Sequence, residues 1–114
     1  MRILVLALLS IGFAGPALAC SCAPVSRDDV VKGADVVFTG TVEKVVREGF
    51  WNVATLKVHD VEKGTVDEEA TVQTAKDSAA CGVNFEVGKK VEVAAIQRKD
   101  RLHTSLCSQM GLGR

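Results

Sequence analysis

The sequence predicts an all-β fold, a small closed barrel of five strands that follows one short helix. Residues 36–107 contain five short runs rich in β-branched residues, separated by turn residues at nearly regular spacing. Such spacing is typical of all-β barrels and sandwiches. Gly40 interrupts the first run, where it favours a bulge or a sharp coil of the kind found in small closed barrels.

The first 19 residues have the layout of a secretory signal peptide. Arg2 supplies a positive charge, residues 3–13 are mostly apolar, and small residues occupy positions −3 and −1 before Cys20. The apolar run is too short to cross a bilayer as a helix. We therefore expect a signal peptide at 1–19 and one secreted or periplasmic domain at 20–114.

The composition of the exported domain excludes several classes of partner. Removal of Arg2 leaves 13 basic and 14 acidic side chains, and the chain contains one Trp, four Phe and no Tyr. This balance gives no positive field for nucleic acid or anionic lipid and few rings for base stacking. We expect a monomer that binds neither nucleic acid nor membrane.

A short helix precedes the strands. Ser26 and Asp29 have the spacing of a capping box, in which each end of the motif satisfies a free backbone group. Val30, Val31 and Ala34 then form an apolar stripe on one face. The pattern predicts about two helical turns.

Alternation of apolar and polar residues defines the strands. In the second run, apolar Leu56 and Val58 alternate with polar Lys57, as in a half-buried strand. A loop at residues 76–85 contains Cys81. The five expected strands lie at residues 36–46, 53–61, 70–74, 90–96 and 102–107.

All four cysteines, Cys20, Cys22, Cys81 and Cys107, lie in the exported part. An even number of cysteines in a short exported chain predicts a disulfide framework. A bond between Cys20 and Cys22 would close a very tight ring, and the other two pairings remain open. A four-thiolate zinc site is disfavoured, because structural zinc sites use cysteine pairs spaced by about two to four residues.

The sequence contains few candidate catalytic residues or motifs. His59 and His103 each lie on an expected strand without a second ligand at metal-binding spacing. Phosphate loops, nucleophile elbows and two-histidine zinc helices are not found in the sequence. We therefore expect no catalytic residue and no cofactor of the chain's own.

Cys20 is the residue with the most distinctive chemistry. Cleavage after Ala19 would give it a free α-amine, whose pKa near 7.7–8.0 leaves a useful neutral fraction at about pH 7. The amine nitrogen and the carbonyl oxygen of one residue can close a five-membered chelate on zinc, which accepts both atom types. Two other interpretations remain: Cys20 is only a disulfide partner, or it is lipidated. Lipidation is disfavoured because leucine lies at −2 rather than −3 and three cysteines would be left over.

Five segments, in matching order, resemble the tissue inhibitors of metalloproteinases. Residues 20–24 resemble the Cys-x-Cys-x-Pro start of the mature family members, and residues 26–41 resemble their first helix and strand. Residues 78–82 resemble a loop with a Cys-Gly pair, and residues 88–94 and 102–108 resemble the last two strands.

This resemblance implies a five-stranded OB-type Greek-key barrel with disulfides Cys20–Cys81 and Cys22–Cys107. It also implies that the amine and carbonyl of Cys20 bind the zinc of a target metalloproteinase, while Ser21 enters a specificity pocket. The protease-contact residues that it implies are Cys20, Ser21, Cys22, Ala23, Pro24, Ser78, Ala79 and Ala80, with Cys81 closing the second segment.

The chain also departs from the family. The second domain and the third disulfide of the first domain are not found in the sequence, and the first hairpin is short. Phe50 and Trp51 occupy its tip, where they either cover the barrel end or form an exposed contact; we favour cover.

The leading functional hypothesis is a secreted inhibitor of zinc metalloendopeptidases. The alternative is an extracellular or periplasmic OB-type module that binds proteins without inhibiting them. The two differ in one requirement, because inhibition needs a free Cys20 amine and simple binding does not.

Overall fold

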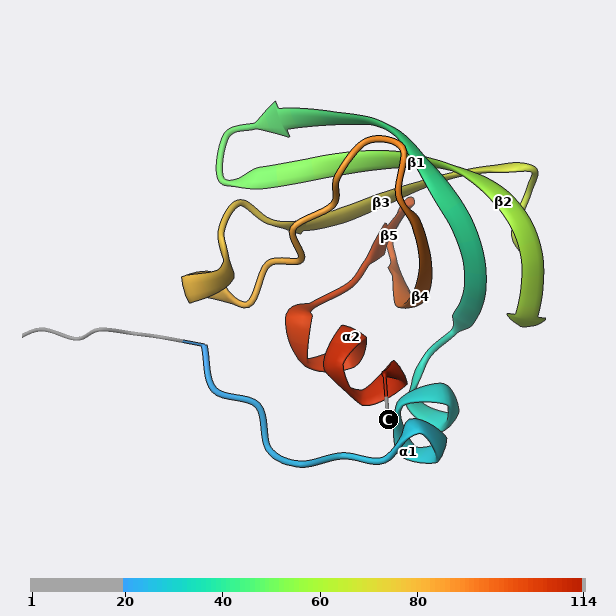
Figure 1. Cartoon of the computed structure of the whole chain (residues 1–114), viewed down its shortest axis with the longest axis vertical. Coiled ribbons are helices and arrows are strands. Elements are labelled where there is room, and N and C mark those ends of the chain that lie inside the picture. The colour runs from blue at the N-terminus through green and yellow to red at the C-terminus, as the bar shows by residue number, and fades with distance from the viewer. Residues whose placement is uncertain (1–19, 114) are drawn as a thin grey trace, which may run out of the picture.

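The computed structural model describes residues 20–113, so the predicted signal peptide at 1–19 lies outside the described residues. The described chain forms a closed barrel with two short α-helices packed together beside it (Figure 1). The elements are α1 (Arg27–Gly33), β1 (Val36–Glu48), β2 (Trp51–Lys63), β3 (Glu69–Ala75), the 3-10 helix η1 (Ser78–Ala80), β4 (Lys90–Arg98), β5 (Arg101–His103) and α2 (Leu106–Leu112).

The strands follow one another around the barrel in the order β1-β2-β3-β5-β4, and β4 returns to β1. Each neighbouring pair is antiparallel except β3 and β5, which are parallel and close the ring. The prediction of a five-stranded barrel preceded by a short helix is therefore confirmed. The architecture is consistent with the OB-type barrel that the resemblance implies.

The predicted irregularity at Gly40 is present in β1. The register between β1 and β2 shifts between Thr39 and Gly40. A Cβ atom at Gly40 would lie 2.7 Å from the carbonyl oxygen of Lys57, so the two strands approach too closely there for any side chain. This bend lets β1 pair with β2 along its length and with β4 over residues 36–41.

The barrel interior is the main hydrophobic core. Phe38, Leu56, Val72 and Val93 are almost completely buried in it. Lys57 is exposed, so the alternation predicted for the second strand is confirmed. A second, smaller cluster lies between α1, α2 and the barrel.

The predicted first helix is α1. The hydroxyl oxygen of Ser26 accepts a hydrogen bond from the backbone N–H of Asp29 at 3.1 Å, as a capping residue does. Among residues 20–113, neither α-helix has the length and apolar composition that crossing a bilayer requires.

The prediction of a fifth strand at residues 102–107 is wrong in its second half. β5 ends at His103, and Leu106 begins helix α2. Ser105 accepts a hydrogen bond from the N–H of Ser108 at 3.4 Å and so caps the helix. Leu102 and Leu106 are apolar residues an even number of positions apart, a pattern that favours a strand. The hydrogen bond between the Ser105 hydroxyl and the nearby backbone instead favours the start of a helix.

An ion-pair network joins α1 to the barrel. The guanidinium of Arg27 lies 2.6 Å from a carboxylate oxygen of Glu62 and 2.6 Å from one of Glu92. It also donates to the carbonyl oxygen of Leu112 at 3.2 Å. Hydrogen bonding to Arg27 lowers the pKa of the Glu92 carboxyl. The network therefore ties α1, β2, β4 and α2 together.

Candidate functional site

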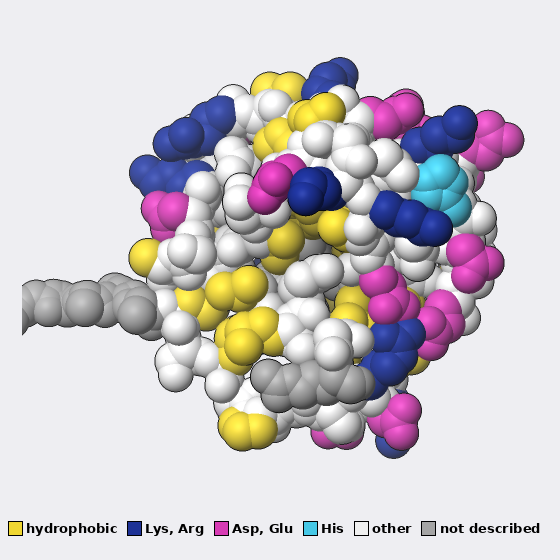
Figure 2. All heavy atoms as spheres, viewed as in Figure 1, with side chains coloured by type: hydrophobic (Ala, Val, Ile, Leu, Met, Phe, Trp, Pro, Cys, Tyr) yellow, Lys and Arg dark blue, Asp and Glu magenta, His cyan; other side chains and the backbone are white. Residues whose placement is uncertain are grey.

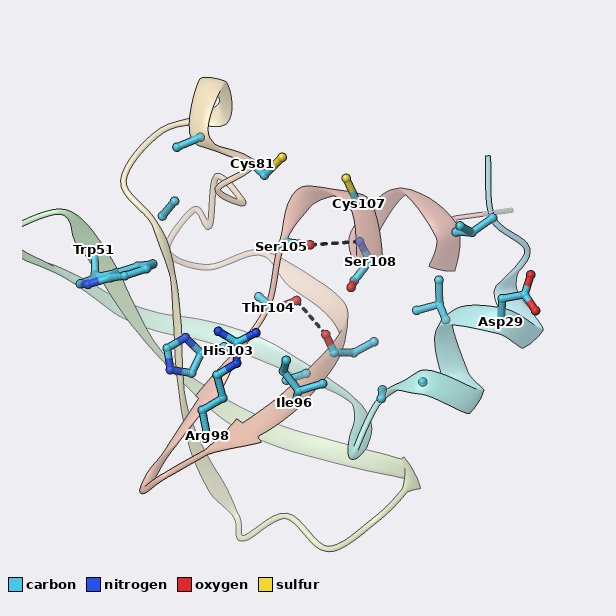
Figure 3. Close-up of a pocket in the computed structure, with 18 residues that line it drawn as sticks. Asp29, Trp51, Cys81, Ile96, Arg98, His103, Thr104, Ser105, Cys107 and Ser108 are labelled. Carbon is cyan, nitrogen blue, oxygen red and sulfur yellow. Dashed lines mark hydrogen bonds between the residues drawn. The ribbon is translucent and has the colours of Figure 1, made fainter. Parts of the chain in front are cut away.

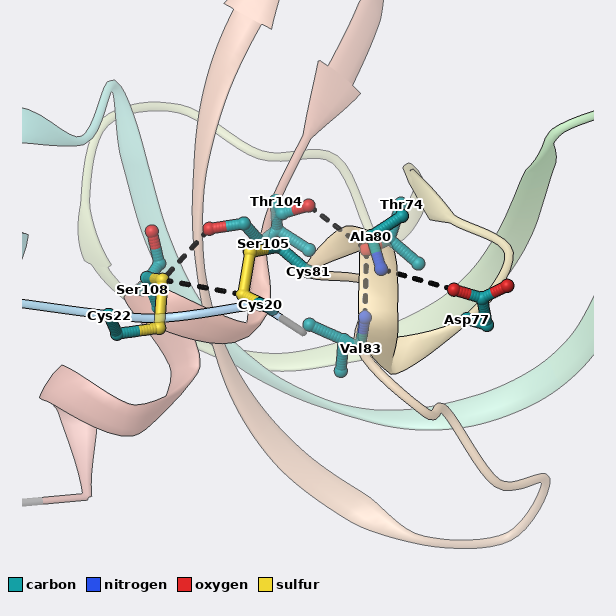
Figure 4. The surroundings of a disulfide bond; sticks show 11 residues. Cys20, Cys22, Thr74, Asp77, Ala80, Cys81, Val83, Thr104, Ser105 and Ser108 are labelled. Carbon is teal, nitrogen blue, oxygen red and sulfur yellow. Dashed lines mark hydrogen bonds between the residues drawn. A yellow bond between two sulfur atoms is a disulfide. The ribbon is translucent and has the colours of Figure 1, made fainter. Parts of the chain in front are cut away.

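Two disulfides fix the start of the described chain to the barrel. Cys20 is bonded to Cys81 and Cys22 to Cys107, with Cα–Cα distances of 5.0 and 5.2 Å. These are the pairs that the resemblance implies. The bonds join residues 61 and 85 positions apart, so residues 20–24 lie beside η1 and α2 (Figure 4).

The sulfur atoms of the two bonds lie close together. The Sγ atoms of Cys20 and Cys107 are 4.0 Å apart, and those of Cys20, Cys81 and Cys107 all lie within 4.8 Å of one another. Within residues 20–113, this is the one cluster of side chains with metal-ligand geometry. All four cysteines form disulfides, so none offers a thiolate ligand.

Residues 20–24 form an extended strip with alternating exposure. The side chains of Cys20 and Cys22 are half-buried because their disulfides turn them toward the barrel. Ser21, Ala23 and Pro24 are exposed. The strip therefore presents small side chains to solvent while its cysteines hold it in place.

The segment with the second predicted contact residues is a compact turn. A carboxylate oxygen of Asp77 accepts a hydrogen bond from the N–H of Ala80 at 3.1 Å. The backbone carbonyl oxygen of Asp77 accepts another from the N–H of Gly82 at 2.9 Å. Ser78 and the two alanines of η1 are exposed. Together with residues 20–24, residues 78–81 form what we call the contact ridge, whose two parts are joined by the Cys20–Cys81 bond (Figure 4).

The backbone after η1 has little freedom. Cys81 adopts a left-handed conformation with φ of 68°, which is uncommon for a residue other than glycine. A Cβ atom at Gly82 would overlap the backbone of Ala75 and Asp77, so only glycine fits beside the barrel here. The Cys81-Gly82 pair therefore sets the position of the ridge relative to β3.

Thr74 anchors this segment from within the barrel. Its side chain is 1% exposed, and its hydroxyl oxygen accepts from the N–H of Val83 at 2.9 Å. The same hydroxyl donates to the carbonyl oxygen of Thr104 at 3.0 Å. One hydroxyl therefore links β3 to the segment after η1 and to the residue that follows β5.

Neither Asp77 nor Thr74 is among the residues predicted from the sequence. Asp77 could have been found, because an aspartate three residues before the end of a turn is a common cap. Thr74 carried no such signal, since its two partners lie nine and thirty positions away.

The structure brings the predicted contact residues together but leaves their metal chemistry untested. In the 114-residue chain the nitrogen of Cys20 is a peptide nitrogen, so zinc binding through an amine requires cleavage after Ala19. The roles of Cys20 and Ser21 at a protease therefore stay predictions.

Neither of the two histidines is part of the contact ridge. His59 is exposed on β2, and its Nε2 lies 2.7 Å from the hydroxyl of Thr41. His103 lies at the end of β5, where burial lowers its pKa and the charges of Arg98 and Arg101 lower it further.

The aromatic residues of the first hairpin are only partly covered. The Phe50 and Trp51 side chains are 51% and 39% exposed, and their rings meet edge to face at 5.4 Å. The ring of Trp51 also lies edge to face with that of His103 at 6.0 Å. Trp51 therefore covers the end of β5 in part, and both rings leave aromatic surface open to solvent.

A groove of about 470 Å³ runs from α1 past the disulfides to Trp51 (Figure 3). Ala80 and Cys81 of the ridge line it, together with Ile96 of β4 and Thr104, which follows β5. Hydrophobic side chains gather on the face shown in Figure 2, below several Lys and Arg side chains. The contact ridge therefore borders a largely apolar depression.

Comparison with known proteins finds no matching family model. The chain is similar to Metalloproteinase inhibitor 2 of Homo sapiens, with 31% identity over 105 residues. The match covers 81% of this chain and 48% of the human protein. The chain thus spans about half the length of this relative, and most of its own length is similar to a metalloproteinase inhibitor.

Proposed function

We propose that the chain is a secreted inhibitor of zinc metalloendopeptidases of the tissue-inhibitor type. The observation that carries the proposal is the Cys20–Cys81 disulfide, which holds the first residue of the expected mature chain against the exposed turn at η1. An ordinary N-terminus frays, whereas this one is fixed. The similarity to a human metalloproteinase inhibitor supports the same class of partner.

The donor atoms of Cys20 fit a metal of the target enzyme. After cleavage its amine nitrogen and its carbonyl oxygen would be three bonds apart, through Cα and the carbonyl carbon, the arrangement that closes a five-membered ring with the metal. A catalytic zinc of the target supplies an open coordination position that accepts nitrogen or oxygen. The chain's own part is to hold these two atoms still, so that little conformational entropy is lost on binding.

The remaining ridge residues suit contact with a protease cleft. Ser21, Ala23 and Ala79 are small and exposed, so binding would desolvate few polar groups. We assign Ser21, the residue after Cys20, to the specificity pocket next to the metal, as the resemblance to the tissue inhibitors of metalloproteinases implies.

The direct experiment is a titration of exported protein against a panel of zinc metalloendopeptidases. Intact mass is measured first, since it separates protein cleaved before Cys20 from uncleaved or lipidated protein. We expect stoichiometric, reversible inhibition of at least one enzyme by protein that begins at Cys20. If such protein binds an enzyme of the panel without inhibiting it, the protein-binding module becomes the better account.

A further inference from the structure

A second surface lies at the end of the barrel where the β1–β2 and β4–β5 hairpins meet. A groove of about 410 Å³ on the β4–β5 hairpin shares Arg98 and His103 with the groove beneath the ridge. We call this surface the aromatic-basic cleft and define it by Phe50, Trp51, Arg98, Lys99, Arg101 and His103.

The cleft carries positive charge that nearby acids do not fully neutralise. Arg98 and Lys99 are exposed and have no ion-pair partner among residues 20–113. Arg101 is paired with Glu48 at 3.2 Å and donates to the side-chain oxygen of Gln73 at 3.0 Å. Asp100 is the acid on the hairpin itself. The lowered pKa of His103, caused by burial and then by the two arginines, agrees with a positive local potential.

Aromatic surface lies directly beside these charges. Trp51 contacts His103 edge to face and lines the same groove as Arg98, with all three on one side of it in Figure 3. Phe50 extends the aromatic surface toward solvent, and the ammonium of Lys76 lies 5.6 Å from the centre of its ring. A ligand here would meet both flat apolar rings and guanidinium groups.

We propose that the aromatic-basic cleft binds an oligosaccharide that carries uronic-acid carboxylates. Arginine forks match carboxylates in two-point hydrogen bonds, and aromatic rings pack on the apolar faces of sugars. The loops after the first and fourth strands are the positions at which OB-type barrels bind oligosaccharides and oligonucleotides. The sugar is favoured over nucleic acid because Phe50 and Trp51 are the only exposed large aromatic side chains among the described residues, too few for a series of stacked bases.

The cleft does not depend on a free Cys20 amine. Its residues lie on β2, β4 and β5 and in the adjoining turns. Sugar binding and protease inhibition can therefore fail independently, and each has its own test.

Trp51 is the single tryptophan of the chain, so its fluorescence reports on this cleft. Disulfide-bonded exported protein is titrated with a hexamer of galacturonate in low-salt buffer. The same titration is run with the methyl-esterified hexamer, which keeps the rings and removes the charges, and with a single-stranded oligothymidylate of 12 nucleotides. We expect a saturable change of Trp51 emission with the galacturonate hexamer alone, weakening as salt rises.

Two charge-matched double variants locate the site. Arg98→Gln with Lys99→Gln should weaken binding by about tenfold or more, as expected for lost charge-assisted hydrogen bonds. Lys57→Gln with Lys90→Gln removes the same charge from exposed positions outside the cleft and should leave binding unchanged.

The proposal is wrong if the galacturonate hexamer gives no saturable change, or if its methyl ester binds equally well. It is also wrong if both double variants lose affinity to the same extent, because binding would then follow net charge alone. Tighter binding of the oligothymidylate than of the sugar would assign the cleft to nucleic acid instead.

Discussion

The buried hydroxyl of Thr74 joins the segment that follows the contact ridge to the barrel core. It accepts from Val83 and donates to Thr104, and it is inaccessible to water. A buried polar group that loses its partner costs more free energy than the bond contributes in net terms. The position of the ridge therefore depends on a residue outside the ridge.

Replacing Thr74 with valine should destabilise the fold. The change keeps the shape but leaves the N–H of Val83 and the carbonyl of Thr104 without this partner, at a cost of about 1–3 kcal/mol. Urea unfolding measures the loss. Thr71→Val, an exposed position on the same strand, is the control and should be nearly neutral. Equal stability of Thr74→Val and the parent would mean that the hydroxyl contributes little.

Ser21 should control which proteases are inhibited. Its side chain is exposed next to Cys20, so its size can change without disturbing the fold. Ser21→Gly should weaken inhibition by about tenfold through lost pocket contacts. Ser21→Leu should still inhibit proteases with deep pockets, but it should no longer inhibit proteases with shallow pockets. Inhibition constants across the enzyme panel provide the measurement, and identical profiles for the three proteins would remove Ser21 from the pocket.

At the scale of elements, the α1–α2 contact is unusually close. A Cβ atom at Gly111 would overlap the side chain of Val30 and lie 2.9 Å from that of Val25, so α2 reaches α1 only through a glycine. Gly111→Ala should therefore lower the free energy of unfolding by about 1–3 kcal/mol. Gly113→Ala is the matched control, because the nearest atom to its Cβ would be 3.6 Å away. If both variants unfold alike, α2 does not pack on α1 as described.

The ion pair between α1 and β4 predicts a pH dependence. Arg27 lowers the pKa of Glu92 in the folded state, so folding is stabilised where the carboxylate is charged. The stabilisation is present above the unfolded pKa of about 4.3 and is lost as the pH falls through the lower folded value. Glu92→Gln should melt below the parent at pH 7, and the difference should close as the pH falls below about 4. If the two proteins differ in melting temperature by the same amount at pH 7 and below about pH 4, the assignment of this ion pair is contradicted.

Local patterns predicted most elements, and the exceptions have a physical cause. The β-branched alternation and the Ser26 cap gave β1 to β4 and α1, because strand faces and helix starts depend on neighbouring residues. α2 was missed because Leu102, Thr104 and Leu106 have strand period, whereas the Ser105 cap and the packing of Leu112 on α1 decide the helix. Tertiary contacts of this kind leave little trace in a short sequence.

The candidate site was predictable to a different degree. The chemistry of Cys20 followed from the cleavage position, and its disulfide partner followed from a resemblance rather than from spacing. The anchoring by Thr74 and the meeting of Trp51 with His103 required the fold, because each joins strands that are distant in sequence.

At the scale of the whole molecule, two long-range bonds hold the start of the expected mature chain. In the chain-entropy model each disulfide over a loop of this length contributes about 4 kcal/mol. A domain of this size has about 5–15 kcal/mol in total. The same bonds thus stabilise the fold and fix the backbone of Cys20, so rigidity of the ridge is inseparable from stability of the barrel.

The proposed zinc capping depends on the exact position of one amine. One alanine added before Cys20 keeps both disulfides and the ridge, but it converts the Cys20 nitrogen into an amide, a very poor zinc ligand, so the five-membered chelate is lost. The extended protein should melt like the parent, since the added residue touches neither core nor disulfides.

The decisive measurement compares inhibition by these two proteins, each verified by intact mass and disulfide mapping, against a metalloendopeptidase that the parent inhibits. We predict that protein beginning at Cys20 inhibits and that the alanine-extended protein loses inhibition by at least about a hundredfold, as expected when the amine–zinc bond and the chelate ring that it closes are lost. Equal inhibition by the correctly folded extended protein would contradict zinc capping by the Cys20 amine.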